Sequence, residues 1–485
     1  MLKIYNTLTK QKEEFNKQPG DKVRMFVCGP TVYDYPHIGH ARTYVIFDVI
    51  AKYLRYKGIE LNYLQNITDI DDKIIARAKE RGIEPKELAD KFEKLYYEDM
   101  KAIGIDSVSQ YACATEHIPE IVDQVKRLID KGHVYKIDPS TSLGASGGFY
   151  FDLSTFPDYG KLSGRTAAQA EDSVSRIDES VSKRNKGDFV LWKLSGKDEP
   201  GWDTELGYGR PGWHIEDTAI SEKYLGQQYE IHGGAQDLMF PHHESEIAQQ
   251  ESASGKKPFV QYWLHSGLLT VDGKKMSKSL GNFVTIQDVL KMISSNKHQV
   301  LRMMFLTSHY RSSVDYDRIK LGQAAAGVKN LIELITHLNL IKEKNIFGIE
   351  NIELSNKIEN YFDGIKKALD DDFNTVEAIG LFSGLSSEAY QVINNKSLDR
   401  KSYELIMDVI NFLDKILGII PDVSLSEEIK LKVMEMDKAR ESGDFKRSDE
   451  IRLYLKESNV TIENLAHTGS TAIAGVKIIE DEKTR

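Results

Sequence analysis

The sequence predicts an α/β fold in which a parallel sheet, split by an insertion, is followed by an α-helical bundle and a small C-terminal domain. Three observations lead to this architecture. The chain has 485 residues, which is too long for a single hydrophobic core. Short apolar runs alternate with helical periods in the first part of the chain, whereas helical periods alone fill most of the part after residue 288.

The N-terminal segment has the alternation that is typical of a parallel sheet. Residues 22–28 form a short apolar run rich in β-forming residues, and residues 61–67 are interpreted as a second strand. The spacing of apolar residues predicts helices over 39–58 and 71–81. Strand, helix, strand and helix in this order predict a Rossmann-like sheet with right-handed crossovers.

The alternation stops near residue 115, and strand-like runs return at 228–232 and 261–270, so the sheet continues after an insertion. Apolar stripes then predict helices at 289–306, 319–339, 357–369, 375–394, 427–441 and 446–456. We therefore divide the chain into a first half of the sheet domain (1–115), an insertion (116–205), a second half (206–270), a linking region with a lysine-rich loop (271–315), a helical bundle (316–420) and a small C-terminal domain (421–485).

The composition is that of an ordinary globular protein, with 40% hydrophobic and 28% charged residues. No apolar run approaches about eighteen residues, so we expect no membrane-spanning helix and no membrane partner. An N-terminus without an apolar leader predicts a cytoplasmic location. The net charge of −10 argues against a basic coat protein for nucleic acid. Two cysteines, Cys28 and Cys113, exclude a disulfide framework.

His37, Gly39 and His40 lie where the segment after the first predicted strand enters the first predicted helix. In a doubly wound sheet, this turn borders the crevice at the carboxyl ends of the strands, where ligands bind. Two imidazoles at a helix start, beside free backbone N–H groups, suit a polyphosphate, and Gly39 lets a flat purine approach the backbone. The turn is therefore a candidate ATP site. The alternative is a helix cap beside a surface histidine.

A lysine-rich loop, GKKMSKSLGN, follows the last predicted strand of the sheet. Mobile lysines in such a loop can neutralise the charge of a leaving pyrophosphate. We assign this role to Lys275 and Lys278, and we place Lys278 at the nucleotide as well. Taken alone, the loop also fits a solvated basic turn.

A segment rich in histidine and glutamate, FPHHESE, begins another predicted helix. His242 and Glu246 are four residues apart and share one helical face, a spacing that suits two ligands of one metal ion. Cys28, at the end of the first strand, is a candidate thiolate ligand. The alternative is that the run only caps and decorates a helix.

Together these motifs resemble the HIGH and KMSKS motifs of class I aminoacyl-tRNA synthetases, and nearly the whole chain is similar to the cysteinyl-tRNA synthetase family. The resemblance rests on FVCGPTVYD, HIGHARTYVIFDVIAKYL, NITDIDDKII, KRNKGDFVLWK, GRPGWHIE, IHGGAQDLMFPHHESEIAQ, HSGLLTVDGKKMSKSLGNF and DDDFNT. It implies ATP-dependent ligation of L-cysteine to tRNA(Cys) through a cysteinyl-adenylate, with release of AMP and pyrophosphate. It also implies that Mg²⁺ accompanies ATP.

The resemblance implies one Zn²⁺ per chain, bound to the thiol of the substrate. Cys28, His242 and Glu246 match the family ligands, whereas Asp217 stands after WHIE where the family has a cysteine. Because aspartate is an acceptable zinc ligand, we expect these four residues to hold the ion and to leave one coordination position for the substrate.

The resemblance further places Thr31, Trp213 and His232 in the cysteine pocket and Asp237 against the substrate's ammonium group. It assigns contact with the tRNA stem to 271–315, further tRNA binding to 316–420 and anticodon binding to 421–485. We expect a monomer. Two other interpretations stay open, namely a ligase that transfers cysteine to a small-molecule amine and a non-catalytic tRNA-binding module.

Overall fold

The structure, a computed structural model, describes residues 1–138, 147–165, 183–196, 198–277, 280–458, 460–465, 469–476 and 478–479. The chain divides into two units. The first comprises Met1–Leu268 with Tyr310–Ser313, and the second comprises Leu269–His309 with Val314–Arg485. The finer division into six segments stays a prediction. Among the described residues, we find no helix with the length and hydropathy that crossing a bilayer requires.

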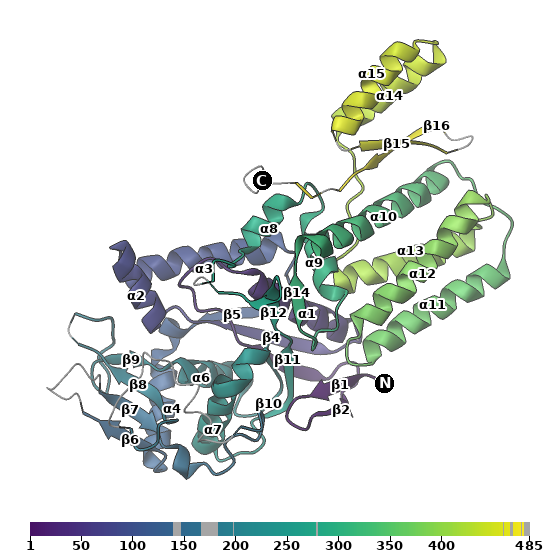
Figure 1. Cartoon of the computed structure of the whole chain (residues 1–485). Helices are drawn as coiled ribbons and strands as arrows, with labels where there is room; N and C mark the ends of the chain where they lie inside the picture. The colour runs from purple at the N-terminus through teal and green to yellow at the C-terminus, as the bar shows by residue number, and fades with distance from the viewer. Residues whose placement is uncertain are drawn as a thin grey trace. The chain divides into compact units, whose positions relative to one another are not determined.

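A five-stranded parallel sheet forms the centre of the first unit, as predicted (Figure 1). Its strand order is β11 (Val260–Ser266), β10 (Tyr229–Ala235), β3 (Lys22–Val27), β4 (Glu60–Ile67) and β5 (Gln110–Cys113). The chain runs outward from β3 to β5 and later adds β10 and β11 on the other side of β3. The strand order therefore reverses between β3 and β10, which is where doubly wound sheets bind ligands.

Helices bury both faces of this sheet. Its crossovers are α1 (Ile38–Tyr56), α2 (Asp72–Arg81), α3 (Pro85–Ala102), α6 (Trp213–Leu225) and α7 (Glu244–Ser254). Gly233 of β10 lies against α1, since a Cβ on it would be 2.2 Å from Phe47 Cε1. On the other face, Phe26 of β3 shares a hydrophobic core with Ile215 and Ile220 of α6. Because side chains alternate along a strand, the side chain of His232 faces α6 together with that of Phe26, its register partner.

Smaller elements complete the first unit. An antiparallel sheet consists of β6 (Val134–Ile137), β7 (Gly148–Phe151), β8 (Phe189–Leu194) and β9 (Gly209–Pro211), and α4 (Ile118–Asp130) precedes it. At the N-terminus, β1 (Lys3–Asn6) and β2 (Gln11–Glu14) form a hairpin.

The segment Tyr310–Ser313 belongs to the first unit although it follows Leu268 by more than forty residues. Gly267 N donates a hydrogen bond of 2.8 Å to Tyr310 O. The buried guanidinium of Arg42 on α1 donates to the carbonyl oxygens of Gly267 and Ser312. These contacts fasten the returning segment to the end of β11.

Two predicted elements are wrong in extent. The strand predicted at 261–270 is two strands, β11 and β12 (Leu269–Val271), and β12 pairs with β13 (Lys274–Lys275) and β14 (Val314–Tyr316) instead. The helix predicted at 289–306 is also two, α8 (Ile286–Met292) and α9 (Lys297–Leu306). Asn296 before α9 has a left-handed φ of 49°, which a continuous helix does not allow.

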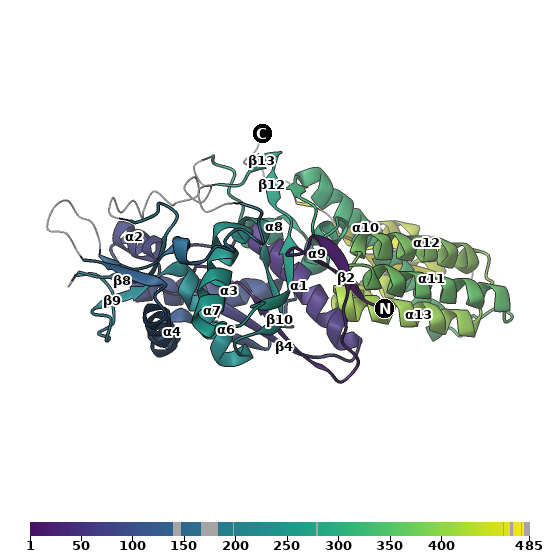
Figure 2. The same cartoon turned by 90° about the horizontal axis from the view of Figure 1, so that it is seen from below.

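Helices dominate the second unit, as predicted (Figures 1 and 2). Its bundle contains α10 (Arg318–Glu343), α11 (Ile352–Asp370), α12 (Thr375–Asn394) and α13 (Arg400–Leu417). A helical pair, α14 (Glu427–Glu441) and α15 (Phe445–Glu457), shares a small core with the hairpin of β15 (Val460–Leu465) and β16 (Gly469–Ala474).

Candidate active site

The predicted metal ligands come from elements that converge at the carboxyl ends of β3 and β10. Cys28 follows β3 directly, and Asp217 lies in the first turns of α6. His242 and Glu246 lie where the irregular turn Met239–His243 continues into α7. All four side chains are buried.

These four residues form one donor set, whose ligand atoms all lie within 4.8 Å of one another. His242 Nε2 is 3.0 Å from Glu246 Oε1 and 3.2 Å from Asp217 Oδ2. Cys28 Sγ is 3.8 Å from Glu246 Oε1. Zinc bonds of about 2.0–2.3 Å in a tetrahedron place the ligand atoms roughly 3.3–3.8 Å apart. The donor types and their spacing therefore fit a zinc ion.

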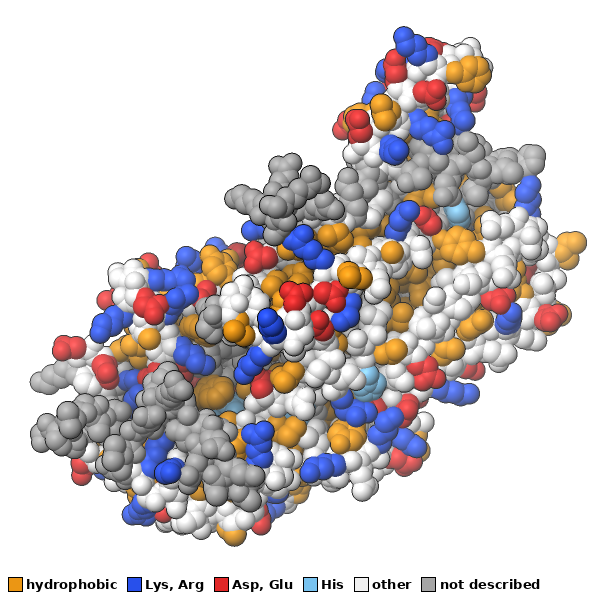
Figure 3. All heavy atoms as spheres, in the orientation of Figure 1, with side chains coloured by type: hydrophobic (Ala, Val, Ile, Leu, Met, Phe, Trp, Pro, Cys, Tyr) orange, Lys and Arg blue, Asp and Glu red, His pale blue; other side chains and the backbone are white. Residues whose placement is uncertain are grey.

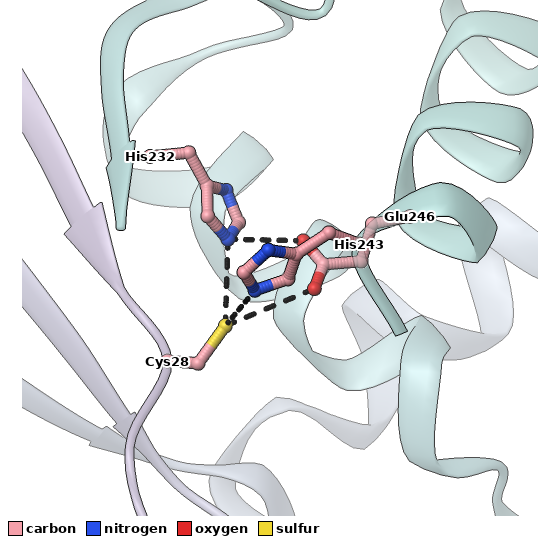
Figure 4. Close-up of side chains that lie close together, drawn as sticks. All are labelled: Cys28, His232, His243 and Glu246. Carbon is pink, nitrogen blue, oxygen red and sulfur yellow. Dashed lines mark hydrogen bonds and ion pairs between the residues drawn. The ribbon is translucent and has the colours of Figure 1, made fainter. Parts of the chain in front are cut away.

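A second donor set shares Cys28 and Glu246 with the first but has two other histidines in place of Asp217 and His242. Cys28, His232, His243 and Glu246 also have ligand atoms within 4.8 Å of one another (Figure 4). Cys28 Sγ is 3.1 Å from His243 Nε2 and 3.4 Å from His232 Nε2. Sequence analysis places His232 in the substrate pocket and does not single out His243.

An irregular turn explains why His243 is missed. Adjacent residues of a regular α-helix point about 100° apart, so only one of two neighbouring histidines is expected at one site. In the turn Met239–His243, Phe240 departs from helical dihedrals, and both His242 and His243 are buried against the cluster. The HH dipeptide itself is the only sequence signal for this arrangement.

Burial and neighbouring charges shift the pKa values of Cys28, Glu246 and His242. Burial, followed by Glu246 and Asp217, raises the pKa of the Cys28 thiol well above its usual value. Burial raises the pKa of Glu246 to about 7, although His242 opposes this. Burial lowers the pKa of His242, but Glu246 and Asp217 outweigh it and raise that pKa to about 10. A buried thiol with two carboxylates needs a cation to stay ionised, which again fits a metal ion.

Each histidine of the cluster is oriented through its Nδ1 atom, while its Nε2 atom faces the other donors. Metal-binding histidines are commonly fixed in this way. The Nδ1 partners are His214 Nδ1 for His242 at 2.7 Å, His265 Nε2 for His243 at 2.8 Å and the Tyr229 hydroxyl for His232 at 2.7 Å.

Asn66 at the end of β4 orients Asp217 and was not predicted to belong to the site. Its Nδ2 donates to Asp217 Oδ1 at 2.8 Å, and its Oδ1 accepts from Gly29 N at 2.7 Å. A Cβ on Gly29 would lie 1.6 Å from Asn66 O, so only glycine fits after Cys28. The amide of Asn66 therefore links Asp217 to the end of β3.

Of the residues predicted to bind the substrate, Trp213 contacts the metal cluster, whereas Thr31 and Asp237 lie in a β-bridge and in an exposed turn. Trp213 is 37% exposed and stacks on His242, with ring centroids 4.3 Å apart, so its indole covers one side of the cluster. Thr31 is half-buried and forms a β-bridge with Thr68. Asp237 is exposed in the short turn after β10.

His37 and His40 cap the N-terminus of α1 reciprocally. His40 N donates to His37 Nδ1 at 3.2 Å, and His37 N donates to His40 Nδ1 at 3.4 Å. Because each Nδ1 accepts a hydrogen bond, each neutral ring carries its proton on Nε2. Burial and the neighbouring His37 hold the pKa of His40 well below its usual value, so this ring is neutral at pH 7. Each ring therefore carries its N–H group on Nε2, and that of His40 is a donor for a ligand.

The histidine turn is also connected to the metal cluster. The ring of His40 stacks on that of Tyr44 at a centroid distance of 6.2 Å. The Tyr44 hydroxyl donates to Cys28 O at 3.3 Å. The candidate nucleotide site and the candidate metal site thus share one wall, built by α1. Gly39, in the first turn of α1, adds no side chain there.

Of the two predicted lysines, the structure describes Lys275, which lies in the second unit. Lys275 is exposed on β13, and Asn282 holds the loop by donating to Lys275 O at 3.1 Å and accepting from Ser277 N at 2.9 Å. Lys278 lies outside the residues that the structure describes.

Comparison with known proteins gives concordant matches. Residues 14–326 match a family model described as tRNA synthetases class I (C) catalytic domain, and residues 364–421 match a DALR domain. Curated proteins named cysteine–tRNA ligase from Carboxydothermus hydrogenoformans and Thermococcus onnurineus are 42% and 40% identical over 96% of this chain, and the matches cover 98% and 97% of those proteins.

Among solved structures, Mycobacterium tuberculosis methionyl-tRNA synthetase in complex with methionyl-adenylate has the same fold, with a TM-score of 0.61 at 15% identity over 82% of this chain and 92% of that one. The match to the class I catalytic model extends over more than half of the chain. By this match and by its full-length similarity to curated relatives, the chain belongs to the cysteine–tRNA ligase family of class I tRNA synthetases.

Proposed function

We propose that this chain ligates L-cysteine to tRNA(Cys) in two steps. In the first step, the cysteine carboxylate attacks the α-phosphate of ATP, which forms cysteinyl-adenylate and releases pyrophosphate. In the second, the acyl group passes to a ribose hydroxyl of the terminal adenosine of the tRNA, and AMP is released. The observation that carries the proposal is the buried Cys28–His242–Glu246 cluster, which shares the wall of α1 with the histidine turn.

We assign the metal ion to Zn²⁺, held by Cys28, Asp217, His242 and Glu246. Asp217 stands where the family has a cysteine, and its carboxylate is near enough to His242 to join the same coordination sphere. These four residues would hold the ion, and the chemistry it would supply is coordination of the substrate's sulfur as a thiolate. The indole of Trp213 covers this site, and Thr31, His232 and Asp237 are assigned to the remaining pocket.

Sulfur recognition by a metal explains how cysteine is distinguished from serine. Near-isosteric substrates differ by only about 1–3 kcal/mol in an apolar pocket, or roughly 10–200-fold. Direct coordination distinguishes cysteine from serine by the bond that the metal forms with the side chain, and not by the shape of the side chain. The reason is that a metal-bound thiol ionises far more readily than a hydroxyl. We therefore expect chelation of the metal to reduce rejection of serine in ATP–pyrophosphate exchange.

In activation, the chain's own residues position the nucleotide and stabilise charge. We assign the Nε2–H groups of His37 and His40, whose Nδ1 atoms cap α1, to the triphosphate. Gly39 leaves room for the purine. Lys275 and Lys278 are assigned to the leaving pyrophosphate, and Mg²⁺ is assigned to ATP.

The second unit is assigned to tRNA. The DALR match at 364–421 supports this assignment for the bundle. The α14–α15 pair has basic and acidic side chains interleaved on the face seen in Figure 3, and several are paired, such as Arg447 with Glu435 and Glu450. Its surface is therefore not uniformly basic, and single anticodon contacts are not assigned.

Cysteine-dependent ATP–pyrophosphate exchange, with and without tRNA, followed by acceptor charging, tests the proposal. Exchange followed by charging of tRNA(Cys) supports it. Exchange without charging indicates a ligase that uses a small-molecule amine. Binding of tRNA without exchange indicates a non-catalytic module. A monomeric state and a cytoplasmic location stay predictions.

A further inference from the structure

The structure assigns to this chain a second binding position for the same divalent cation. We propose that Cys28, His232, His243 and Glu246 hold a zinc ion without Asp217 or His242, so that the cavity retains its metal when Asp217 is lost. This inference rests on the metal site of the proposed function and adds two ligands to it.

The distances within the second donor set match those of a metal site. Cys28 Sγ lies 3.1 Å from His243 Nε2 and 3.4 Å from His232 Nε2, and Glu246 Oε2 lies 3.3 Å from His232 Nε2 (Figure 4). These values lie close to the roughly 3.3–3.8 Å that tetrahedral zinc requires between its ligand atoms. One thiolate and one carboxylate with two neutral imidazoles also balance a charge of 2+.

The carboxylate of Glu246 gives independent support, because its two oxygens face different imidazoles. Oε1 lies 3.0 Å from His242 Nε2, whereas Oε2 lies on the side of His232. Oε2 is fully buried and accepts no hydrogen bond among the described residues. A buried acceptor without a donor is costly. A cation between Cys28 and the two imidazoles of the second set satisfies it.

Both histidines of the second donor set have a hydrogen-bond partner at Nδ1 that fixes the orientation of the ring. The Tyr229 hydroxyl fixes His232 through Nδ1, and His265 fixes His243 in the same way. His265 is itself held by Thr7 Oγ1, 2.9 Å from its Nδ1. Outer partners of this kind orient metal-binding histidines and matter nearly as much as the ligands.

Zinc affinity of four forms of the full chain tests the inference, with a chromophoric chelator as competitor. The forms are the wild type, Asp217→Asn, His243→Leu and the double variant. If either donor set suffices, each single variant keeps one zinc per chain and loses less than about 10-fold in affinity, whereas the double variant loses more than about 100-fold. If the two donor sets can replace each other, the loss of zinc affinity in the double variant is expected to exceed the sum of the losses in the single variants.

Cobalt substitution reports the ligands directly and does not depend on activity. In Asp217→Asn, the sulfur-to-cobalt charge-transfer band is expected to persist, because Cys28 belongs to both sets, while the ligand-field bands shift as nitrogen replaces oxygen. His232→Leu in the Asp217→Asn background serves as the second double variant should the first fail to fold.

Loss of zinc from Asp217→Asn alone, or a double variant no weaker than Asp217→Asn, overturns the inference. Failure of the proposed function is distinguishable from this. A wild type that charges tRNA while Asp217→Asn is metal-free refutes only the second donor set. A wild type that shows the predicted metal pattern but no cysteine-dependent exchange refutes only the function.

Discussion

Substitution of His37 separates two roles that the structure gives to one side chain. Its Nδ1 atom caps α1 by accepting from His40 N at 3.2 Å, and its Nε2–H group is assigned to the triphosphate. Asparagine is among the best helix caps but has no imidazole. His37→Asn therefore keeps the first role and removes the second, whereas His37→Ala removes both.

The two effects have different magnitudes. Loss of an N-cap costs about 1 kcal/mol, which lowers the Tm of a large unit by roughly 2–4 °C. Loss of one positioned donor to developing charge costs about 10²–10³-fold in rate. We expect both variants to slow ATP–pyrophosphate exchange by that factor, and His37→Ala alone to lower the Tm.

Exchange kinetics and thermal melts of the two variants provide the measurement. Ser426→Ala, which removes the N-cap of α14, is the matched control and should leave the exchange rate unchanged. Wild-type exchange by His37→Asn would show that His37 acts only as a helix cap. Equal Tm values for His37→Asn and His37→Ala would show that the capping bond contributes nothing.

Three further predictions concern other parts of the molecule. Lys278→Ala should slow exchange by about 10²–10³-fold with the KM for cysteine nearly unchanged; a raised KM at normal turnover contradicts the assignment. Gly233→Ala should destabilise the first unit by about 1–3 kcal/mol in thermal melts, because the new Cβ meets Phe47 at 2.2 Å, whereas Gly196→Ala, with nothing within 4 Å, should be neutral. Trp213→Ala should raise the KM for cysteine about 2- to 12-fold, the equivalent of a stacking contribution of about 0.5–1.5 kcal/mol; an effect confined to kcat would argue against a pocket role.

Four strands of the sheet were predictable because short runs rich in β-forming residues alternate with helical periods, and the bundle was predictable because its helices have regular apolar stripes. The strand β5 and the helix α3 were not predicted. Two element lengths were wrong because a single residue interrupts a helix or strand although the apolar pattern continues on both sides of it. Asn296 divides the predicted helix 289–306, and Gly267, whose Cβ would lie 2.3 Å from Ser312 O, divides the predicted strand 261–270. Such breaks depend on tertiary neighbours. The helix α13 went unpredicted although its apolar stripe is regular.

The part of the candidate site that could be predicted consists of residues that are close in the sequence and therefore close in the fold. The four-residue interval between His242 and Glu246 is of this kind. His243 was missed because a non-helical turn points it inward, and Asn66 was missed because its partner Asp217 is 151 residues away. Only the fold brings such residues together, so no local pattern indicates them.

The return of Tyr310–Ser313 to the first unit affects how this unit is made and dissected. A ribosome that has just added residue 268 has not yet supplied the carbonyl of Ser312, so the guanidinium of Arg42 lacks an acceptor that the finished protein provides. Completion of the sheet domain during synthesis must therefore wait until the start of the helical half has emerged. For the same reason, a sheet domain cut after residue 268 would lack the partners that Tyr310–Ser313 provides to Gly267 and Arg42. A fragment meant to fold independently must therefore extend through residue 313.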